Sequence, residues 1–124
     1  SHTKLFDFLT IYALQHPKKA KVPSSEAHIE ALITQAENTI QNDLNGYLAI
    51  AEDPDYDTKL LIHRAMALEA IQMNWSTKEF YTPEGKRLGT SLDEVVKNIK
   101  DPDYQEDYLK IKAVVTANSK KNKD

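Results

Sequence analysis

The chain has no cysteine, only three glycines and only one tryptophan among its 124 residues. Without cysteine there are no disulfides, no thiolate catalysis and no Cys-based zinc sites, so packing must hold the fold together. Three glycines are too few for a protein built from tight β-turns or for a glycine-rich phosphate loop. No apolar run is long enough to cross a bilayer, and we expect neither a membrane span nor a signal peptide. These absences favour helices and disfavour most classes of enzyme.

The residues that are present are typical of one small globular domain. Hydrophobic residues make up 40% of the chain and charged residues 28%, with a net charge of −3. This balance predicts a packed core rather than disorder. We therefore predict a single helical domain over residues 1–124, with Ser1 and His2 interpreted as an expression scar and residues 118–124 as a flexible tail.

Apolar residues recur at the helical period of 3.6 along most of the chain. Between the helices, the Pro83-Glu-Gly85 turn predicts a loop or a small hairpin around residues 77–89, and we favour the loop. The sequence thus predicts an all-α bundle of about four to five helices. The predicted helices cover residues 4–15, a segment of roughly 20 to 27 residues that follows an N-cap at Ser24 or Ser25, residues 59–75, a short helix capped by Ser91, and a last helix that starts at Asp101-Pro-Asp-Tyr104.

The second predicted helix carries the longest apolar stripe in the chain. We expect this stripe to pack in the core, with the opposite face in solvent. Its members are Ile29, Ile33, Ala36, Ile40, Leu44, Tyr47, Leu48 and Ala51.

No pattern in the sequence predicts a catalytic, cofactor or metal site. Asp53, Asp55 and Asp57 alternate like the first ligands of an EF-hand, but Thr58 occupies the glycine position and Arg64 the position of the bidentate carboxylate. A helix N-terminus accounts better for these acids. The four histidines are scattered, without metal-binding spacing. We expect no enzyme activity and no cofactor.

The charges are unevenly distributed along the chain. Residues 1–23 hold four lysines and one aspartate, whereas residues 24–57 hold eight acidic residues and no lysine or arginine. This split suits contact between identical subunits, where the acids of one copy face the lysines of another, although a plain solvated face fits it equally well. With only two arginines in the chain, sequence-specific nucleic-acid binding is not expected. The candidate subunit-interface or lumen residues are Lys18, Lys19, Lys21, Glu30, Glu37 and Asp43.

The order of three segments resembles that of a known family. Residues 25–40 read Ser25-Glu-Ala-His-Ile-Glu-Ala-Leu-Ile-Thr-Gln-Ala-Glu-Asn-Thr-Ile40, an acidic residue followed by Ile-x-x-Leu-Ile-x-x-Ala. Asp53-Pro54 then opens a strongly apolar segment, and Leu88-Gly-Thr-Ser-Leu92 leads into a short helix. Over about residues 5–100, this order is similar to that of the small helical head-tail connector (adaptor) proteins of long-tailed bacteriophages.

The resemblance implies a structural protein of the virion, assembled in the host cytoplasm. Copies would form a homo-oligomeric ring between the portal protein and the tail-side connector protein, with DNA passing through the centre. An acidic lumen would repel the DNA backbone and let it slide.

A second interpretation is a small cytoplasmic helical adaptor or regulatory protein. It would bind a protein partner through exposed aromatic residues in the region of Tyr47, Tyr56 or Trp75.

Overall fold

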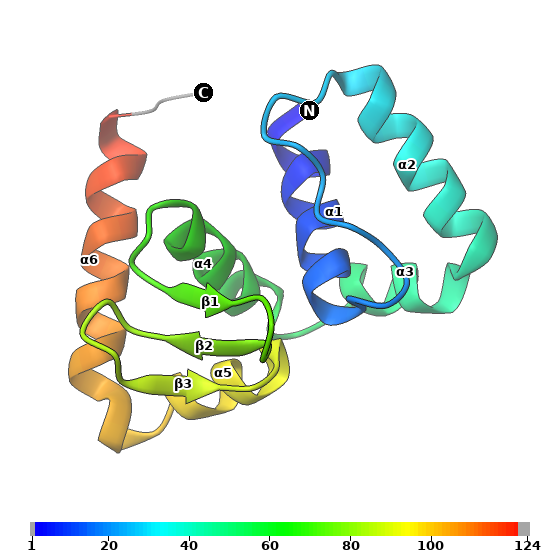
Figure 1. Ribbon diagram of the computed structural model, residues 1–124. Helices are drawn as coiled ribbons and strands as arrows, with labels where there is room; N and C mark the ends of the chain where they lie inside the picture. The colour runs from blue at the N-terminus through cyan, green and yellow to red at the C-terminus, as the bar shows by residue number, and fades with distance from the viewer. Residues whose placement is uncertain (1, 122–124) are drawn as a thin grey trace. The chain divides into compact units, whose positions relative to one another are not determined.

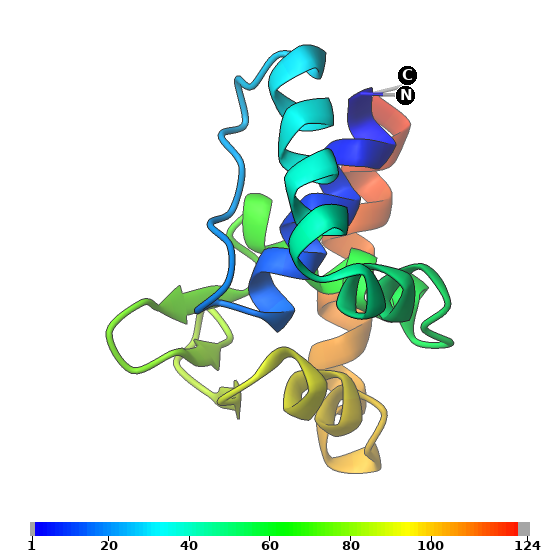
Figure 2. The ribbon, with the colours of Figure 1, turned by 90° about the vertical axis from the view of Figure 1, so that its right-hand side faces the viewer.

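The computed structural model describes the backbone of residues 2–121 and the side chains of residues 2–118. The chain divides into two compact units, unit 1 (residues 1–57) and unit 2 (residues 58–124). Figures 1 and 2 show the elements of each unit from two directions. Ser1 and residues 122–124 of the predicted tail lie outside the described residues.

Unit 1 consists of three helices and a long loop. They are α1 (His2–Gln15), α2 (Ile29–Asn42) and α3 (Leu44–Ala51), with residues 16–28 as the loop between α1 and α2. The first helix is confirmed. Leu9 of α1 packs against Leu32 and Ala36 of α2, and this small cluster is extended by Leu5, Phe6, Ala27 and Tyr47. The Phe8 and Tyr47 ring centroids are 4.6 Å apart, which ties α3 to α1.

The prediction of one helix of 20 to 27 residues is wrong, because Asp43 interrupts the helical conformation. Asp43 has φ −153° and ψ 65°, which ends α2. Its side chain then caps α3 by accepting a hydrogen bond from the Gly46 backbone N–H at 3.1 Å. A Cβ at Gly46 would clash with the Asp43 carboxylate, so glycine leaves the room that the cap requires.

The predicted start of this helix is also wrong. α2 begins at Ile29, and its N-cap residue His28 makes no side-chain capping bond. Ser24 instead forms a local turn, in which its Oγ accepts a hydrogen bond from the Glu26 backbone N–H at 3.2 Å. A serine and a nearby acid thus formed a turn where the sequence predicted a helix start.

Unit 2 combines three helices with a small antiparallel sheet, so a helical class is confirmed but the all-α description is incomplete. The strands pair in the order β1-β2-β3, with Met73 opposite Phe80 and Phe80 opposite Gly89. α5 packs against β3 and contacts α6. The elements are α4 (Tyr56–Ala67, which starts in unit 1), β1 (Gln72–Asn74), β2 (Glu79–Tyr81), β3 (Arg87–Gly89), α5 (Leu92–Ile99), a 3-10 turn η1 (Pro102–Tyr104) and α6 (Gln105–Lys121).

The helix predicted over residues 59–75 ends eight residues early. Glu69 adopts a left-handed conformation with φ 61°. The Ala70 backbone N–H then bonds back to the Ala65 carbonyl at 2.8 Å, which closes the C-terminus of α4. Met73 therefore lies in β1 rather than in a helix. Because no glycine or asparagine marks this left-handed position, no residue in the sequence predicts the end of the helix here.

The favoured loop over residues 77–89 is wrong, and the alternative hairpin is correct. β2 and β3 pair around the Pro83-Glu-Gly85 turn, where Gly85 has φ 93° and the Thr82 N–H bonds to the Lys86 carbonyl at 2.8 Å. The sequence analysis missed β1 altogether.

Two helix starts are confirmed in unit 2. The Ser91 side chain accepts a hydrogen bond from the Glu94 backbone N–H at 3.1 Å at the start of α5. Asp101 accepts one from the Asp103 N–H at 2.9 Å, ahead of α6, which includes residues 118–121 of the predicted tail. None of the helices within the described residues has the length and apolarity needed to cross a membrane.

Candidate interaction surfaces

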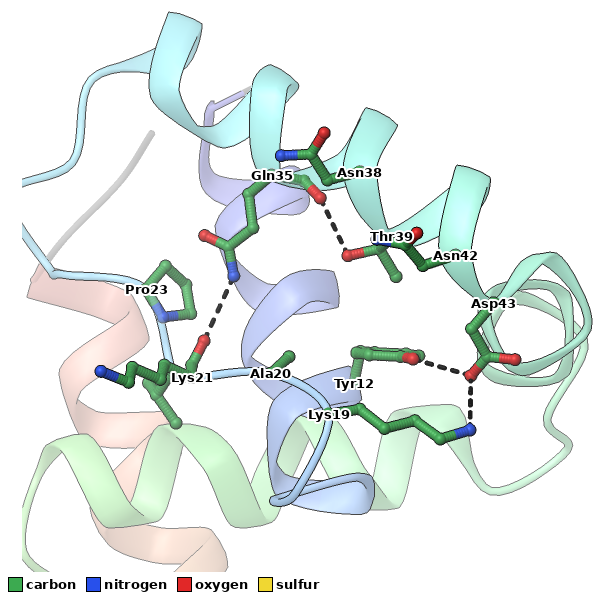
Figure 3. Close-up of a pocket in the computed structure, with 11 residues that line it drawn as sticks. Tyr12, Lys19, Ala20, Lys21, Pro23, Gln35, Asn38, Thr39, Asn42 and Asp43 are labelled. Carbon is green, nitrogen blue, oxygen red and sulfur yellow. Dashed lines mark hydrogen bonds and ion pairs between the residues drawn. The ribbon is translucent and has the colours of Figure 1, made fainter.

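Tyr12, Lys19 and Asp43 form a polar cluster that joins the loop to α1 and to the junction of α2 and α3 (Figure 3). Asp43 Oδ2 accepts a hydrogen bond from the Tyr12 hydroxyl at 2.7 Å and lies 3.2 Å from Lys19 Nζ. The Tyr12 bond, the Lys19 bond and the Gly46 N–H together lower the pKa of Asp43 to about 2. Burial, reinforced by the bond to the carboxylate, raises the pKa of Tyr12 to about 12.

This cluster brings together only two of the six residues proposed as an interface. Lys19 and Asp43 pair within one chain, so neither carries its charge unpaired toward a neighbour. Lys18 and Lys21 are exposed on the loop, and Glu30 and Glu37 are exposed on α2. These four make no ion pair within the described part of the chain.

A cavity of about 570 Å³ lies between the loop and α2. Gln35 donates a hydrogen bond to the Lys21 carbonyl at 3.2 Å and so holds the loop at this side of α2 (Figure 3). The wall is mixed, with apolar loop residues facing amide and hydroxyl groups of the helices. It is formed by Tyr12, Lys19, Ala20, Lys21, Val22, Pro23, Gln35, Asn38, Thr39, Asn42 and Asp43.

The apolar stripe that the sequence assigned to the core is largely at the surface. α2 buries a different row, Leu32, Ala36 and Thr39, of which only Ala36 belongs to the predicted stripe. We call its five exposed large aliphatic residues the α2–α3 stripe. They are Ile29, Ile33, Ile40, Leu44 and Leu48, with exposed fractions of 38 to 50%.

The α2–α3 stripe and the cavity face different sides of α2. Residues two positions apart on an α-helix point about 200° away from each other. Ile33 and Gln35 are such a pair, as are Ile40 and Asn42, and in each pair the second residue lines the cavity. Both surfaces are therefore open to separate neighbours at the same time.

Unit 2 has an exposed aromatic patch around Trp75. The side chain of Trp75 is 58% exposed, and Lys78 Nζ lies 5.6 Å from the centre of its ring. With Met66, Ile71 and Met73 it lines a hollow of about 330 Å³. Of the aromatic residues proposed for partner binding, Trp75 is the exposed one, since Tyr47 and Tyr56 are partly buried beside Phe8.

Within the described residues, no three His, Asp or Glu side chains gather in a way that could hold a metal ion. The residues that line the cavity offer hydroxyl, amide, ammonium and carboxylate groups. This arrangement is suited to polar contacts with a partner surface. Sequence reasoning missed Tyr12 and Gln35, because their contacts depend on how the loop folds back. The spacing Asp43-x-x-Gly46 was the one available signal in the sequence for the break between α2 and α3.

No family model, no curated protein and no solved structure matches this chain.

Proposed function

We propose that this protein is a non-enzymatic assembly subunit of the head-tail connector type. Copies associate into a ring between a portal protein and a tail-side connector protein in the virion, and DNA passes through the ring. The order of segments described above suggests the class. The observation that carries the proposal is the exposed α2–α3 stripe.

An exposed row of large aliphatic side chains is costly in water and marks a surface that a protein partner covers. Ile29, Ile33 and Ile40 lie on α2, and Leu44 and Leu48 lie on α3 beyond the break at Asp43. Glu30 and Glu37 flank the row on α2 and would supply the polar rim of an interface. This combination supports a role in assembly.

The test is the oligomeric state, measured by sedimentation velocity and negative-stain microscopy up to about 1 mM protein, alone and with a portal ring. We expect closed rings under at least one of these conditions. Ile33→Asp combined with Ile40→Asp should abolish them, because two buried carboxylates would have no partners.

Leu109→Asp is the matched control, since Leu109 is a 54% exposed aliphatic residue on α6 in unit 2. It should leave the rings intact. A protein that stays monomeric with and without the portal, or rings that tolerate the double substitution, would refute the proposed function.

The Trp75 patch favours a second candidate, a cytoplasmic helical adaptor that binds a protein partner. Exposed tryptophan beside methionine is typical of a partner-binding surface. Here Trp75→Ala should abolish capture of the partner and leave rings unaffected, whereas Ile33→Asp should have no effect on capture. Equal loss from both variants would exclude Trp75 as a separate binding site.

A further inference from the structure

We propose that the cavity between the loop and α2 receives the α2–α3 stripe of a second copy of this chain, so that subunits join head to tail. This inference deepens the proposed function, on which it rests, by naming the two surfaces that meet. The occupant is a second copy, argued from the position, shape and charge of the two surfaces.

The cavity and the α2–α3 stripe lie on different sides of α2. Gln35, Asn38 and Asn42 line the cavity, whereas Ile29, Ile33 and Ile40 lie on another side of the same helix. A copy that inserts its stripe into one neighbour therefore keeps its cavity free for the next. Contacts of this heterologous kind repeat until they close into a ring or extend into a filament.

The two surfaces also complement each other in shape, and part of the cavity wall is apolar. The stripe is a protruding row of aliphatic side chains, and the cavity of about 570 Å³ is hollow. The loop side of the cavity offers apolar contact through Val22, which is 41% exposed, and through the half-buried Ala20. The aliphatic part of the Lys21 side chain adds to this apolar wall.

Charge then selects the pairing. The stripe is flanked by Glu30 and Glu37, and no lysine or arginine occurs in residues 24–57 to neutralise them. The loop beside the cavity carries Lys18 and Lys21, which are exposed and make no ion pair within the described residues. A head-to-tail contact places these opposite charges together, which favours both encounter and register.

A two-fold contact between two stripes would not have this advantage. Such a contact uses the same patch on both copies. Because residues 24–57 hold no lysine or arginine, the acidic edge with Glu30 and Glu37 would meet no basic group of the partner's segment, and the like net charges of the two segments disfavour the contact. The acids and the absence of bases in this segment thus argue against a stripe-to-stripe dimer.

The experiment uses two charge-reversed proteins. In the edge variant, Glu30→Lys and Glu37→Lys make the flank of the stripe basic. In the loop variant, Lys18→Glu and Lys21→Glu make the border of the cavity acidic. Each variant alone should self-associate at least about tenfold more weakly than the wild type, because like charges meet at every contact.

An equal mixture of the two variants should recover assembly. The basic edge of the first variant then meets the acidic loop of the second, and the acidic edge of the second meets the basic loop of the first. Lys97→Glu with Lys112→Glu lowers the net charge by the same amount as the loop variant, at exposed positions in unit 2, and should leave self-association unchanged. Circular dichroism checks that each variant folds.

Several results would overturn this inference. They are undiminished assembly of the loop variant, a mixture that is no better than its components, and absence of self-association by the wild type up to about 1 mM. Portal-bound rings that tolerate the loop variant would leave the connector function standing and refute only the contact. Head-to-tail association that obeys the charge reversal but forms filaments without binding a portal would support the contact and refute the connector function.

Discussion

Units 1 and 2 differ in where they keep their large apolar side chains. In unit 2 the buried set draws on every helix and on two of the three strands. It comprises Ile62, Ala65, Ala70, Ile71, Phe80, Leu88, Leu92, Val95, Val96, Ile99, Ile111 and Val115. In unit 1 the buried apolar residues are Leu9, Ile11, Tyr12, Ala13, Leu32, Ala36 and Ile50, and only Leu9, Leu32 and Ala36 of these form the α1–α2 cluster. The five residues of the α2–α3 stripe remain exposed, whereas the exposed large apolar side chains of unit 2 are those of Trp75, Leu109 and Val114.

The contrast suggests that the two units contribute differently to folding stability and to surface contacts. Burial of apolar surface is the main favourable contribution to folding, so unit 2 has the more complete core of its own. Unit 1 holds its helices with a small cluster and the polar contacts of Asp43, and the aliphatic side chains of the α2–α3 stripe stay exposed. Substitutions in the two units should therefore affect different measurements.

The largest effect is expected from truncation of the unit 2 core. Leu88→Ala removes a fully buried side chain in β3 and should lower the free energy of unfolding by about 3 to 4 kcal/mol. Ile33→Ala, on the exposed stripe, should change it by less than about 0.5 kcal/mol. Urea denaturation of the isolated protein measures both values.

The comparison becomes sharper when the same two variants are tested for self-association. Ile33→Ala should weaken self-association. Leu88→Ala should leave self-association unchanged at urea concentrations and temperatures where the variant is still folded. A large loss of monomer stability from Ile33→Ala would show that the stripe belongs to a core, and the contrast between the units would fail.

Both units contain elements that the sequence predicted and elements that it did not. In unit 2 the starts of α5 and α6 were predicted correctly, because Ser91 and Asp101 bond to nearby N–H groups and such signals are local. The end of α4 was missed, since a left-handed Glu69 carries no sequence signal. Periodicity identified the apolar residues of unit 1 but not which of two adjacent rows would be buried. That choice depends on where α1 packs, which is a tertiary effect.

The second prediction concerns the break between α2 and α3. Alanine normally stabilises a helix by about 1 kcal/mol relative to glycine. Gly46→Ala should instead destabilise the protein by about 1 to 2 kcal/mol, because the new Cβ displaces the Asp43 carboxylate from its cap. Thermal or urea unfolding gives the sign directly.

Asn45→Ala is the matched control, because Asn45 lies one residue earlier in α3 and is exposed. It should be neutral or stabilising. If Gly46→Ala proves as stable as Asn45→Ala, the chain has room for one continuous helix and the cap at Asp43 is dispensable.

The third prediction tests the polar contacts that hold unit 1. Tyr12→Phe removes the hydroxyl that donates to Asp43 and should cost about 1.5 kcal/mol in unfolding free energy. The pKa of Asp43 is lowered from 3.8 to about 2, so its contribution is complete above pH 4 and lost as the pH falls toward 2. The pKa of Tyr12 is raised from 10.0 to about 12, so its contribution is lost as the pH rises from 10 to 12.

Melting temperatures across pH 2 to 12 should therefore fall at both ends of the range. The alkaline fall should be smaller in Tyr12→Phe, which lacks the ionisable hydroxyl. The acid fall should be smaller in Asp43→Asn, which keeps an oxygen for the Gly46 N–H. Profiles identical to that of the wild type would show that this pair does not link stability to pH.

The smallest effects are expected at the helix caps, where the units differ again. α5 in unit 2 has a side-chain cap from Ser91, whereas His28, the N-cap residue of α2 in unit 1, makes no side-chain capping bond. Ser91→Ala should lose about 1 kcal/mol, and Ser91→Asp should retain most of the stability. His28→Ser should gain up to about 1 kcal/mol, because its hydroxyl can accept from an N–H in the first turn of α2.

The sign of the change in unfolding free energy on His28→Ser is informative, since it shows whether a side-chain cap at this position would stabilise α2. A gain without any change in self-association would place this deficit in the monomer alone. A gain accompanied by weaker assembly would mean that His28, which is exposed just before Ile29, belongs to the surface that a neighbouring copy covers. A loss on His28→Ser would contradict the absence of a cap at the start of α2.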